Sequence, residues 1–425
     1  MRYSSRLSLL LKKRTQHRPL SSNNVDDVVP SFYVAATRQH AGKTTVSLAL
    51  MSGLQKKFNK VGFIKPIGEK STVIHEHGID VAVDKDAVLF KEHFQMDHVP
   101  WRSVSPVIIP PGYTRDYLDN KITLDVQKEK LKEAYNDIAS RSELILCEGT
   151  GNCAVGSIVD ASNADIAAWL GSPMVLVVNG GLGRSIDELT LNLTLCEVHN
   201  VPVAGVIVNQ VQPDKFDQTM HYFKLAMQRK WPDIPVLGAV PDKQFLGCPA
   251  LSELEVLLKG NLLTGREHSL RHYRVRRDLQ LVADSLESFL QELRHQRAVI
   301  DDGHQRRTLF VCHASRNDIL LGFLMEAQQN YEHSPRWQAS LLMTGCADYP
   351  LSDQLTDFVT TMPNAPPVLI TPFQTDESLE LMYGYTAKLN AEDRHRVDAA
   401  IHHYEPHIDF DLLMNRITIL KQKNL

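Results

Sequence analysis

The sequence predicts an α/β fold in which a doubly wound, mostly parallel sheet is followed by a second, smaller α/β domain. Two observations predict it: short apolar runs alternate with helical patterns from residue 31 onward, and the alternation resumes after residue 308. The runs expected to form buried strands of the first domain are 32–36, 61–65, 144–148, 174–178, 203–209 and 236–240. The segments between them are long enough for crossover helices, which favours parallel strands.

The helical patterns delimit the expected domains. After the first run, apolar residues recur every four positions from Val46 to Phe58, as on the buried stripe of a helix. The pattern predicts one domain over residues 30–258, a linker helix over 259–307, and a second α/β domain over 308–425. In that second domain we expect strands at 308–313, 340–344 and 368–371, and helices near 377–389 and 391–404.

Composition excludes several classes of protein. With 43% apolar and 23% charged residues, the 425-residue chain is typical of a globular protein rather than a disordered, collagenous or coiled-coil one. No run approaches the roughly 18 apolar residues that a membrane helix needs, so no membrane span is expected. The six cysteines form no CxxC pair, which favours reduced, intracellular thiols.

The beginning of the chain differs from the rest. Residues 1–25 hold six Lys or Arg, five Ser and no acidic residue, and without those six the chain has 40 basic and 50 acidic residues, a net charge of −10. We interpret residues 1–28 as an organelle transit peptide, mitochondrial rather than plastid, although a disordered basic tail of a cytoplasmic protein has the same composition. The acidic remainder argues against nucleic-acid binding.

A phosphate-binding loop is expected between the first strand and the first helix, where residues 36–45 read ATRQHAGKTT. Such a loop aims backbone N–H groups and a helix N-terminus at an anion, while Lys43 adds a positive charge and the Thr44 hydroxyl can bind Mg²⁺. Thr37 stands where the common G-x-x-x-x-G-K-[ST] pattern has its first glycine. The residues expected to bind ATP here are Thr37, His40, Ala41, Gly42, Lys43, Thr44 and Thr45.

Charged side chains near the strand ends complete the expected site. Glu148 ends a strand and runs into a Gly-Thr-Gly turn that lets a ligand approach, and Asp86 precedes an apolar run, where helix capping is its simpler role. Carboxylates at this edge of a sheet suit Mg²⁺, so Thr44, Asp86 and Glu148 are the expected metal ligands. Lys65 ends the second strand, where it can reach the phosphates; with Lys43 and Glu148 it is an expected catalytic residue.

These segments resemble dethiobiotin synthetase in order and at similar spacing. The matching segments are 37–44, 62–67, 147–149, 173–178 and 203–209. The resemblance covers residues 31–245 and implies a P-loop NTPase fold, with ATP and Mg²⁺ as ligands. It also implies that Asn209 faces the nucleobase.

The substrate side departs from that family. Dethiobiotin synthetase has Asp-Thr-Glu where residues 38–40 read RQH, and a pocket serine near residues 68–69, which read GE. Arg38 lies five residues before Lys43, where the related dimeric partitioning ATPases place a lysine that reaches across the dimer. The resemblance thus implies a homodimer in which Arg38 has a catalytic role on the partner's nucleotide; a solvated arginine is the alternative.

The second domain resembles the DRTGG domain, in segments 309–318, 341–345, 367–371 and 376–389. That module follows a dethiobiotin-synthetase-like domain at the front of long phosphate acetyltransferases, where it has a regulatory character. The chain ends where their acetyltransferase domain would begin, so we expect no acetyl transfer by this chain itself. A separate phosphate acetyltransferase is then a candidate partner.

Two functions stay open from the sequence. The first is a regulatory, ATP-binding P-loop NTPase with Mg²⁺-dependent hydrolysis that acts on a partner in an acyl-phosphate or acetyl-CoA pathway. The alternative is an ATP-dependent ligase of dethiobiotin synthetase type, which activates a carboxylate or carbamate. A glutaminase triad of Cys346, His403 and Glu405 is less favoured, because a buried Cys and a surface His explain the same residues.

Overall fold

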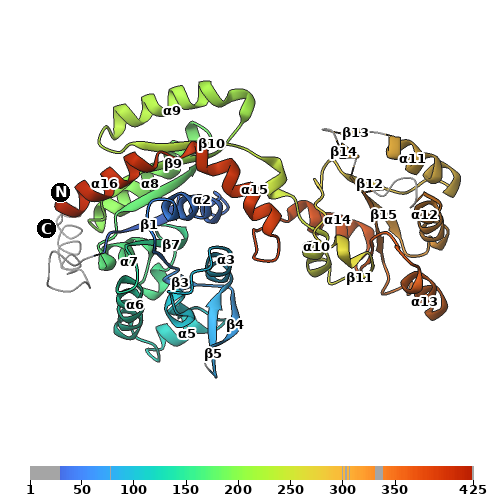
Figure 1. Ribbon diagram of the computed structural model, residues 1–425, viewed down its shortest axis with the longest axis horizontal. Helices are drawn as coiled ribbons and strands as arrows, with labels where there is room; N and C mark the ends of the chain where they lie inside the picture. Colours follow the sequence, from blue (N-terminus) through green and yellow to red (C-terminus); the bar gives the residue numbers. More distant parts are fainter. Residues whose placement is uncertain are drawn as a thin grey trace, which may run out of the picture. The chain divides into compact units, whose positions relative to one another are not determined.

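The computed structural model of the protein describes residues 29–76, 78–298, 300–301, 304–305, 307–330 and 338–423 (Figure 1). The described chain divides into two compact units. Unit 1 holds the described residues up to Asp242 together with those from Leu389 onward, and unit 2 holds Lys243–Lys388. Unit 2 is therefore an insertion within the chain of unit 1. The predicted transit peptide, residues 1–28, lies outside the described residues.

Unit 1 is built on six parallel strands in the order β10-β9-β8-β1-β7-β2. They are β1 (Ser31–Ala36), β2 (Val61–Ile64), β7 (Leu144–Asn152), β8 (Met174–Asn179), β9 (Val203–Val211) and β10 (Val236–Pro241). All six predicted strands are present, because strands covered on both faces are nearly continuous apolar segments. The chain leaves the central β1 toward β2 and β7 on one side and later fills the other side, so the carboxyl end of β1 is a topological switch point.

Helices cover this sheet and connect its strands (Figure 1). α2 (Lys43–Gln55) packs on β1, β7 and β2; α6 (Leu124–Ala139) packs on β2 and β7; and α7 (Asn163–Leu170) packs on β1 and β7. α8 (Gly183–Val198) packs on β8, and α9 (Phe216–Lys230) on β10. The shorter elements are β3 (Ile67–Gly68), β4 (Ser71–Glu76), β5 (Ile79–Asp84), α3 (Lys85–His93), α4 (Trp101–Val104), β6 (Val107–Ile108) and α5 (Tyr113–Leu118). Within the described ranges, no helix combines the length and apolar character needed to cross a membrane.

The C-terminal segment returns to unit 1. α15 (Arg394–Tyr404) packs against α2, and α16 (Phe410–Lys423) packs against α2, β9 and β10. Phe410 lies so close to α2 that a Cβ on Gly53 would be 2.1 Å from its ring. The start of α16 is therefore fitted to the helix that follows the phosphate-binding loop.

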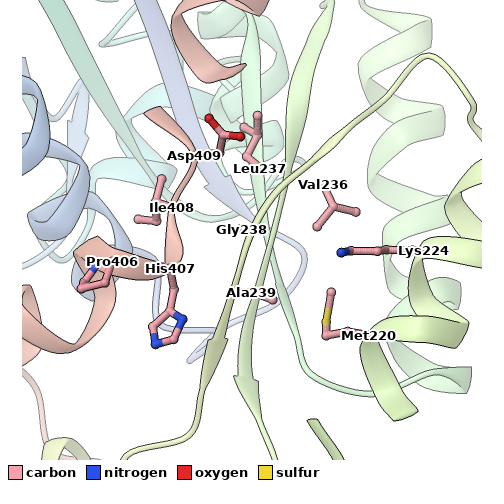
Figure 2. Close-up of a pocket in the computed structure, with 10 residues that line it drawn as sticks. All are labelled: Met220, Lys224, Val236, Leu237, Gly238, Ala239, Pro406, His407, Ile408 and Asp409. Atoms are coloured by element: carbon pink, nitrogen blue, oxygen red, sulfur yellow. The ribbon is translucent and has the colours of Figure 1, made fainter. Parts of the chain in front are cut away.

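Residues 406–409 run along the outer edge of β10 (Figure 2). Asp409 donates its backbone N–H to the carbonyl of Leu237 at 2.7 Å. A cavity of about 410 Å³ lies between this segment, β10, and Met220 and Lys224 of α9. The C-terminal segment thus covers an edge strand that would otherwise present unpaired backbone groups.

The division into units differs from the predicted domains 30–258 and 308–425. Unit 2 begins at Lys243, and residues 389–425 belong to unit 1 rather than to the second domain. α16 buries Leu413 and Ile417 completely or nearly so. Helical periodicity reveals that one face of such a helix is buried, but it does not reveal which unit covers that face.

Unit 2 is a smaller α/β unit with a mixed sheet in the order β11-β17-β16-β15-β12. Its strands are β11 (Asn261–Thr264), β12 (Leu279–Leu281), β15 (Thr308–His313), β16 (Ala339–Thr344) and β17 (Val368–Ile370), of which β11 alone runs antiparallel to its neighbour. α11 (Leu286–Ala298), α12 (Asn317–Asn330) and α13 (Asp353–Thr361) contribute to one apolar core, and α10 (Leu251–Leu257) and α14 (Thr375–Gly384) to a second. A short pair, β13 (Ile300–Asp301) and β14 (His304–Gln305), stands apart from this sheet.

The linker helix predicted over 259–307 is not a single element. β11, β12 and α11 all fall within that range, and the whole of it lies in unit 2. Leu279 pairs with Leu309 in the sheet, so it is a strand residue. A helix was predicted over this range because Leu279 and other apolar residues before α11 happen to continue its helical period.

Candidate nucleotide site

The loop between β1 and α2 has the backbone that phosphate binding requires. Gly42 is the N-cap of α2 with φ 80°, and His40 also has a positive φ of 59°. A Cβ on Gly42 would lie 2.1 Å from Nδ2 of Asn209, so glycine is needed at this position. The first turn of α2 contains no acidic residue, and no side chain caps its N–H groups. Those groups are therefore available to an anion.

Lys43 and Thr44, the first residues of α2, both contact Glu148 on β7. Nζ of Lys43 lies 2.7 Å and Oγ1 of Thr44 lies 3.1 Å from the same oxygen, Oε1. In the β1–β7 register, Val34 stands opposite Glu148, which places the carboxylate beside the loop. Burial lowers the pKa of Lys43, and the carboxylate of Glu148 opposes this shift.

Lys65 joins the same cluster from the end of β2. Its Nζ forms an ion pair with Asp86 and lies 3.4 Å from Oε1 of Glu148. Burial alone would lower the pKa of Lys65, but the carboxylates of Asp86, Glu148 and Asp84 raise it above its ordinary value. The ammonium is therefore charged at any physiological pH.

Asp84, the N-cap of α3, is a further member of this cluster. Its carboxylate accepts a hydrogen bond from the backbone of Asp86 at 2.9 Å, as the N-cap of α3, and lies 3.5 Å from Nζ of Lys65. It also accepts from the backbone of Glu69 at 3.0 Å. Burial raises the pKa of Asp84, while Lys65 opposes this. Asp84 thus fixes the approach of α3, and with it Asp86, to Lys65.

The oxygen donors of the cluster fit a magnesium ion. Oε2 of Glu148 is buried and has no hydrogen-bond partner, so one oxygen of this carboxylate is left for a ligand. Thr44, Asp86 and Glu148 offer the hard oxygen atoms that Mg²⁺ prefers. Among the residues that the structure describes, no group of three or more His, Cys, Asp and Glu side chains is placed to hold a metal ion. Such an ion would therefore depend on phosphate oxygens and water as well.

Arg38 lies on the other side of the loop from Lys65. Its Nε donates to Oδ1 of Asn179 at 3.0 Å and lies 3.8 Å from Glu188 on α8. The side chain is 37% exposed. Within this chain Arg38 is thus held by β8 and α8, away from the Lys43–Glu148 pair.

Asn209 and Thr37 stabilise the phosphate-binding loop through hydrogen bonds. Asn209 is fully buried, and its Nδ2 donates to the carbonyl of Ala41 at 2.8 Å. The backbone N–H of Thr37 donates to Val177, and its carbonyl accepts from Asn192 at 3.0 Å. Asn192 on α8 was not singled out from the sequence, because a polar residue inside an amphipathic helix carries no local signal of its partner.

The turn after Glu148 is fixed by a second residue that the sequence did not reveal. Oδ1 of Asn163 accepts from the backbone of Thr150 at 3.1 Å and from the Tyr33 hydroxyl at 2.8 Å. Its Nδ2 donates to the carbonyls of Thr150 and Asn152. Residues 149–152 are therefore held rigidly beside the cluster, where the outer end of a bound phosphate chain would lie.

The residues of the less favoured glutaminase triad have other roles. Cys346 belongs to unit 2, and burial raises the pKa of its thiol, which disfavours the thiolate. His403 and Glu405 belong to unit 1: Nε2 of His403 lies 2.8 Å from the carbonyl of Pro241, and Glu405 accepts a hydrogen bond from Ser52 at 2.9 Å.

The fold and the site together define a P-loop domain of the ATPase or ligase type. The defining features of this domain are a parallel sheet, a glycine-containing loop at the carboxyl end of the central strand, and a lysine paired with a strand-end carboxylate. The chain belongs to the AAA_26 family, described as an AAA domain, which matches residues 31–250.

Relatives of known identity agree with this class. A phosphate acetyltransferase of Synechocystis sp. is 23% identical over 400 residues, which cover 93% of this chain and 53% of that protein. An ATP-dependent dethiobiotin synthetase of Methanocaldococcus jannaschii is 26% identical over 217 residues, 50% of this chain and 94% of that protein. The predicted resemblance to dethiobiotin synthetase is thereby confirmed.

A solved structure, the MinC:MinD cell division protein complex of Aquifex aeolicus, aligns with a TM-score of 0.32 at 14% identity, covering 51% of this chain and 83% of that one. The present chain spans about half the length of the phosphate acetyltransferases that it matches.

Proposed function

We propose that unit 1 binds ATP with Mg²⁺ at residues 37–45 and hydrolyses it, and that unit 2 has a regulatory role. The observation that carries the proposal is the convergence of Lys43, Lys65 and Glu148 at the uncapped N-terminus of α2. This point lies at the carboxyl end of the central strand, where nucleotides bind in open α/β sheets.

The contacts indicate what each side chain does when nucleotide binds. Phosphate oxygens that enter the N-terminus of α2 compete with Glu148 for the ammonium of Lys43. Glu148, Thr44 and Asp86 would hold Mg²⁺, which would neutralise charge on the phosphates. Lys65 is kept charged by its acidic neighbours and stabilises the transferring phosphoryl group.

The regulatory role is supported by the connectivity of the chain. Unit 2 is entered after Asp242 and left before Leu389, so the polypeptide returns to unit 1 immediately before α15, which packs on α2. The similarity to phosphate acetyltransferases covers 93% of this chain and so includes unit 2. We therefore infer that unit 2 is a DRTGG-like module and that a phosphate acetyltransferase on a separate chain is its candidate partner.

A ligase of dethiobiotin synthetase type is the second candidate. It is favoured by the rigid turn at residues 149–152, held by Asn163 next to Glu148. A carboxylate or carbamate acceptor beside Thr150 and Glu69 would attack the γ-phosphorus of ATP and displace ADP, with the protein supplying position and charge.

Two further proposals concern assembly and location. In a homodimer, the 37% exposed Arg38 would leave Asn179 and contact the partner's nucleotide. Sedimentation velocity with and without ATP tests whether the chain forms a dimer. A monomer under both conditions would contradict the proposal.

We also propose a mitochondrial location from the composition of residues 1–28. A reporter fused to those residues that stays in the cytosol would contradict it.

One assay separates the two candidate functions. ADP release by the purified chain is measured alone and with diaminopelargonate plus bicarbonate, for wild type and Lys43→Ala. Substrate-stimulated turnover favours the ligase, whereas tight nucleotide binding without stimulation favours the regulatory NTPase. Wild type that neither binds nor hydrolyses nucleotide would remove both.

A further inference from the structure

Two buried cysteines of unit 1 face each other where β7 ends. Sγ of Cys153 lies 3.8 Å from Sγ of Cys196, although the two residues are 43 positions apart in the sequence. Both side chains are buried, with exposed fractions of 0% and 1%, and both are free thiols. The fold therefore brings a thiol that directly follows β7 into contact with a thiol of α8.

The separation of the two sulfurs suits a disulfide. An S–S bond is about 2.05 Å long, so the sulfurs must approach by roughly 1.8 Å. Rotation of the two side chains about their Cα–Cβ bonds and a small backbone shift can supply a movement of this size. Cys248, by contrast, donates its thiol to the carbonyl of Gln244 at 3.2 Å. The contact of Cys153 with Cys196 is therefore one that oxidation can convert into a covalent bond.

Each of the two thiols lies one residue from the surface. Ala154, which follows Cys153, and Glu197, which follows Cys196, are both exposed. A small local opening is therefore enough to admit a small neutral oxidant such as hydrogen peroxide. The thiol–thiol contact and burial raise the pKa of Cys153. Because a protonated thiol reacts slowly, the pair stays reduced at rest and is oxidised by sustained exposure to peroxide.

The oxidation consumes one molecule of hydrogen peroxide. A thiolate of the pair attacks one peroxide oxygen, the O–O bond breaks, hydroxide leaves, and the sulfur becomes a sulfenic acid. The second thiol attacks that sulfur, so that the S–S bond forms, the S–O bond breaks, and the hydroxyl group leaves as water with the proton of this thiol. The proton of the first thiol neutralises the hydroxide. Two thiols and one peroxide thus give one disulfide and two water molecules, and two electrons pass from sulfur to oxygen.

The pair is linked to the phosphate-binding loop through Asn192. The backbone N–H of Cys153 donates to Oδ1 of Asn192 at 3.0 Å, and Nδ2 of the same side chain donates to the carbonyl of Thr37 at 3.0 Å. Asn192 lies one helical turn before Cys196 on α8. A disulfide that draws Cys153 and α8 together therefore disturbs the amide group that holds both Thr37 and the end of the turn at 149–152.

We propose that Cys153 and Cys196 form a reversible redox site, whose disulfide loosens the phosphate-binding loop and lowers its affinity for nucleotide. In the reduced form, Asn192 is bonded to both Cys153 and Thr37, and this is the form that binds nucleotide. Formation of the disulfide follows from the geometry of the thiols, whereas its effect on nucleotide binding rests on the proposed function.

The test compares the full chain before and after oxidation. The reduced protein is treated with hydrogen peroxide, its remaining thiols are alkylated, and it is digested without a reductant. Mass spectrometry should then find the peptides of Cys153 and Cys196 joined, and dithiothreitol should separate them. ATP affinity with Mg²⁺, measured by calorimetry, should fall roughly five-fold on oxidation, the loss of about one hydrogen bond, and should recover after reduction.

Three variants assign the effect to this pair. Cys153→Ala and Cys196→Ala should keep their ATP affinity under the same peroxide treatment, because neither can form the disulfide. Cys248→Ala is the matched control, since it removes a buried thiol of unit 2, and it should lose affinity on oxidation as wild type does. If one of the first two variants does not fold, the other gives the same comparison.

The outcomes separate this inference from the proposed function. Peroxide-treated wild type in which the two peptides stay unlinked would overturn the redox site, whatever its affinity for nucleotide. Linked peptides with unchanged ATP affinity would overturn the effect on the loop, as would a loss of affinity that the Cys153→Ala and Cys196→Ala variants share. Reduced wild type that binds no ATP would remove the proposed function and the effect on nucleotide binding, while the peptide map would still decide whether the disulfide forms.

Discussion

Nζ of Lys43 lies 2.7 Å from Oε1 of Glu148, and Thr44 donates its hydroxyl to the same oxygen at 3.1 Å. One carboxylate oxygen on β7 therefore holds both side chains that open the phosphate-binding helix. The other oxygen is buried without a partner. This arrangement keeps Lys43 ordered without nucleotide and leaves one strong acceptor for a cation.

Replacement of Lys43 tests the charge that faces the phosphates. Lys43→Ala should lower ATP affinity by about ten-fold or more and slow hydrolysis by roughly 100-fold, because a charge-assisted contact to the outer phosphates is lost. Calorimetry and ADP release measure the two effects. Lys60→Ala, an exposed lysine beyond α2, should match wild type. Equal behaviour of the two variants would contradict the assigned role.

Replacement of Glu148 separates nucleotide binding from metal use. Glu148→Gln preserves the size of the side chain but removes the carboxylate that competes for Lys43. ATP affinity should stay constant or rise, whereas the Mg²⁺ concentration needed for half-maximal hydrolysis should increase by about ten-fold or more. A titration of Mg²⁺ at saturating ATP measures this. An unchanged Mg²⁺ dependence would show that the carboxylate does not serve the metal.

The backbone of the loop predicts a loss of stability. Gly42→Ala places a Cβ 2.1 Å from Asn209 at a residue with φ +80°, so it should lower the free energy of unfolding by about 2 kcal/mol or more. Gly183→Ala, at the start of α8 where a Cβ meets nothing within 4 Å, should be neutral or slightly stabilising. Urea unfolding of both variants measures the difference, and similar values for the two would refute the steric argument.

The capping box that Ser162 and Asp165 form at the start of α7 predicts that stability depends on pH in the acid range. Hydrogen bonds from His199 and Ser162 lower the pKa of Asp165 below 3.8 even though burial alone would raise it. Its stabilising contribution is therefore complete above pH 3.8 and is lost as the pH falls through the lower folded-state value. Asp165→Asn should cost about 1 kcal/mol at neutral pH and flatten the stability curve in this acid range.

The control for that prediction is Asp125→Asn, an exposed carboxylate in the first turn of α6. It should leave the slope of stability against pH between 4 and 2 unchanged. Chemical unfolding at several pH values in this interval gives the slopes. A wild-type slope as flat as that of Asp165→Asn would contradict the role of the cap.

The sheet of unit 1 could be predicted because its signals are local. Strands buried on both faces are continuous apolar segments, and the sequence from Gly42 to Thr44 matches the pattern that opens a phosphate-binding helix. Glu148 and Lys65 could be proposed because each stands at the end of such a strand, and the carboxyl ends of parallel strands share one edge.

The features of the fold and the site that were not predicted depend on contacts between distant parts of the chain. The return of α15 and α16 to unit 1 was not predicted, since the period of α16 does not identify the surface that buries Leu413. Asn163 and Asn192 support the loops through side-chain bonds to backbone far away in sequence. Asp84 joins the cluster through a contact to Lys65 that is formed only in the folded unit.

The most direct test of the account is calorimetric titration of the full, folded chain with ATP and Mg²⁺. We predict saturable binding with one nucleotide per chain, weaker without Mg²⁺ and absent or strongly reduced in Lys43→Ala. A folded wild-type protein that binds neither ATP nor ADP under these conditions would contradict the nucleotide site.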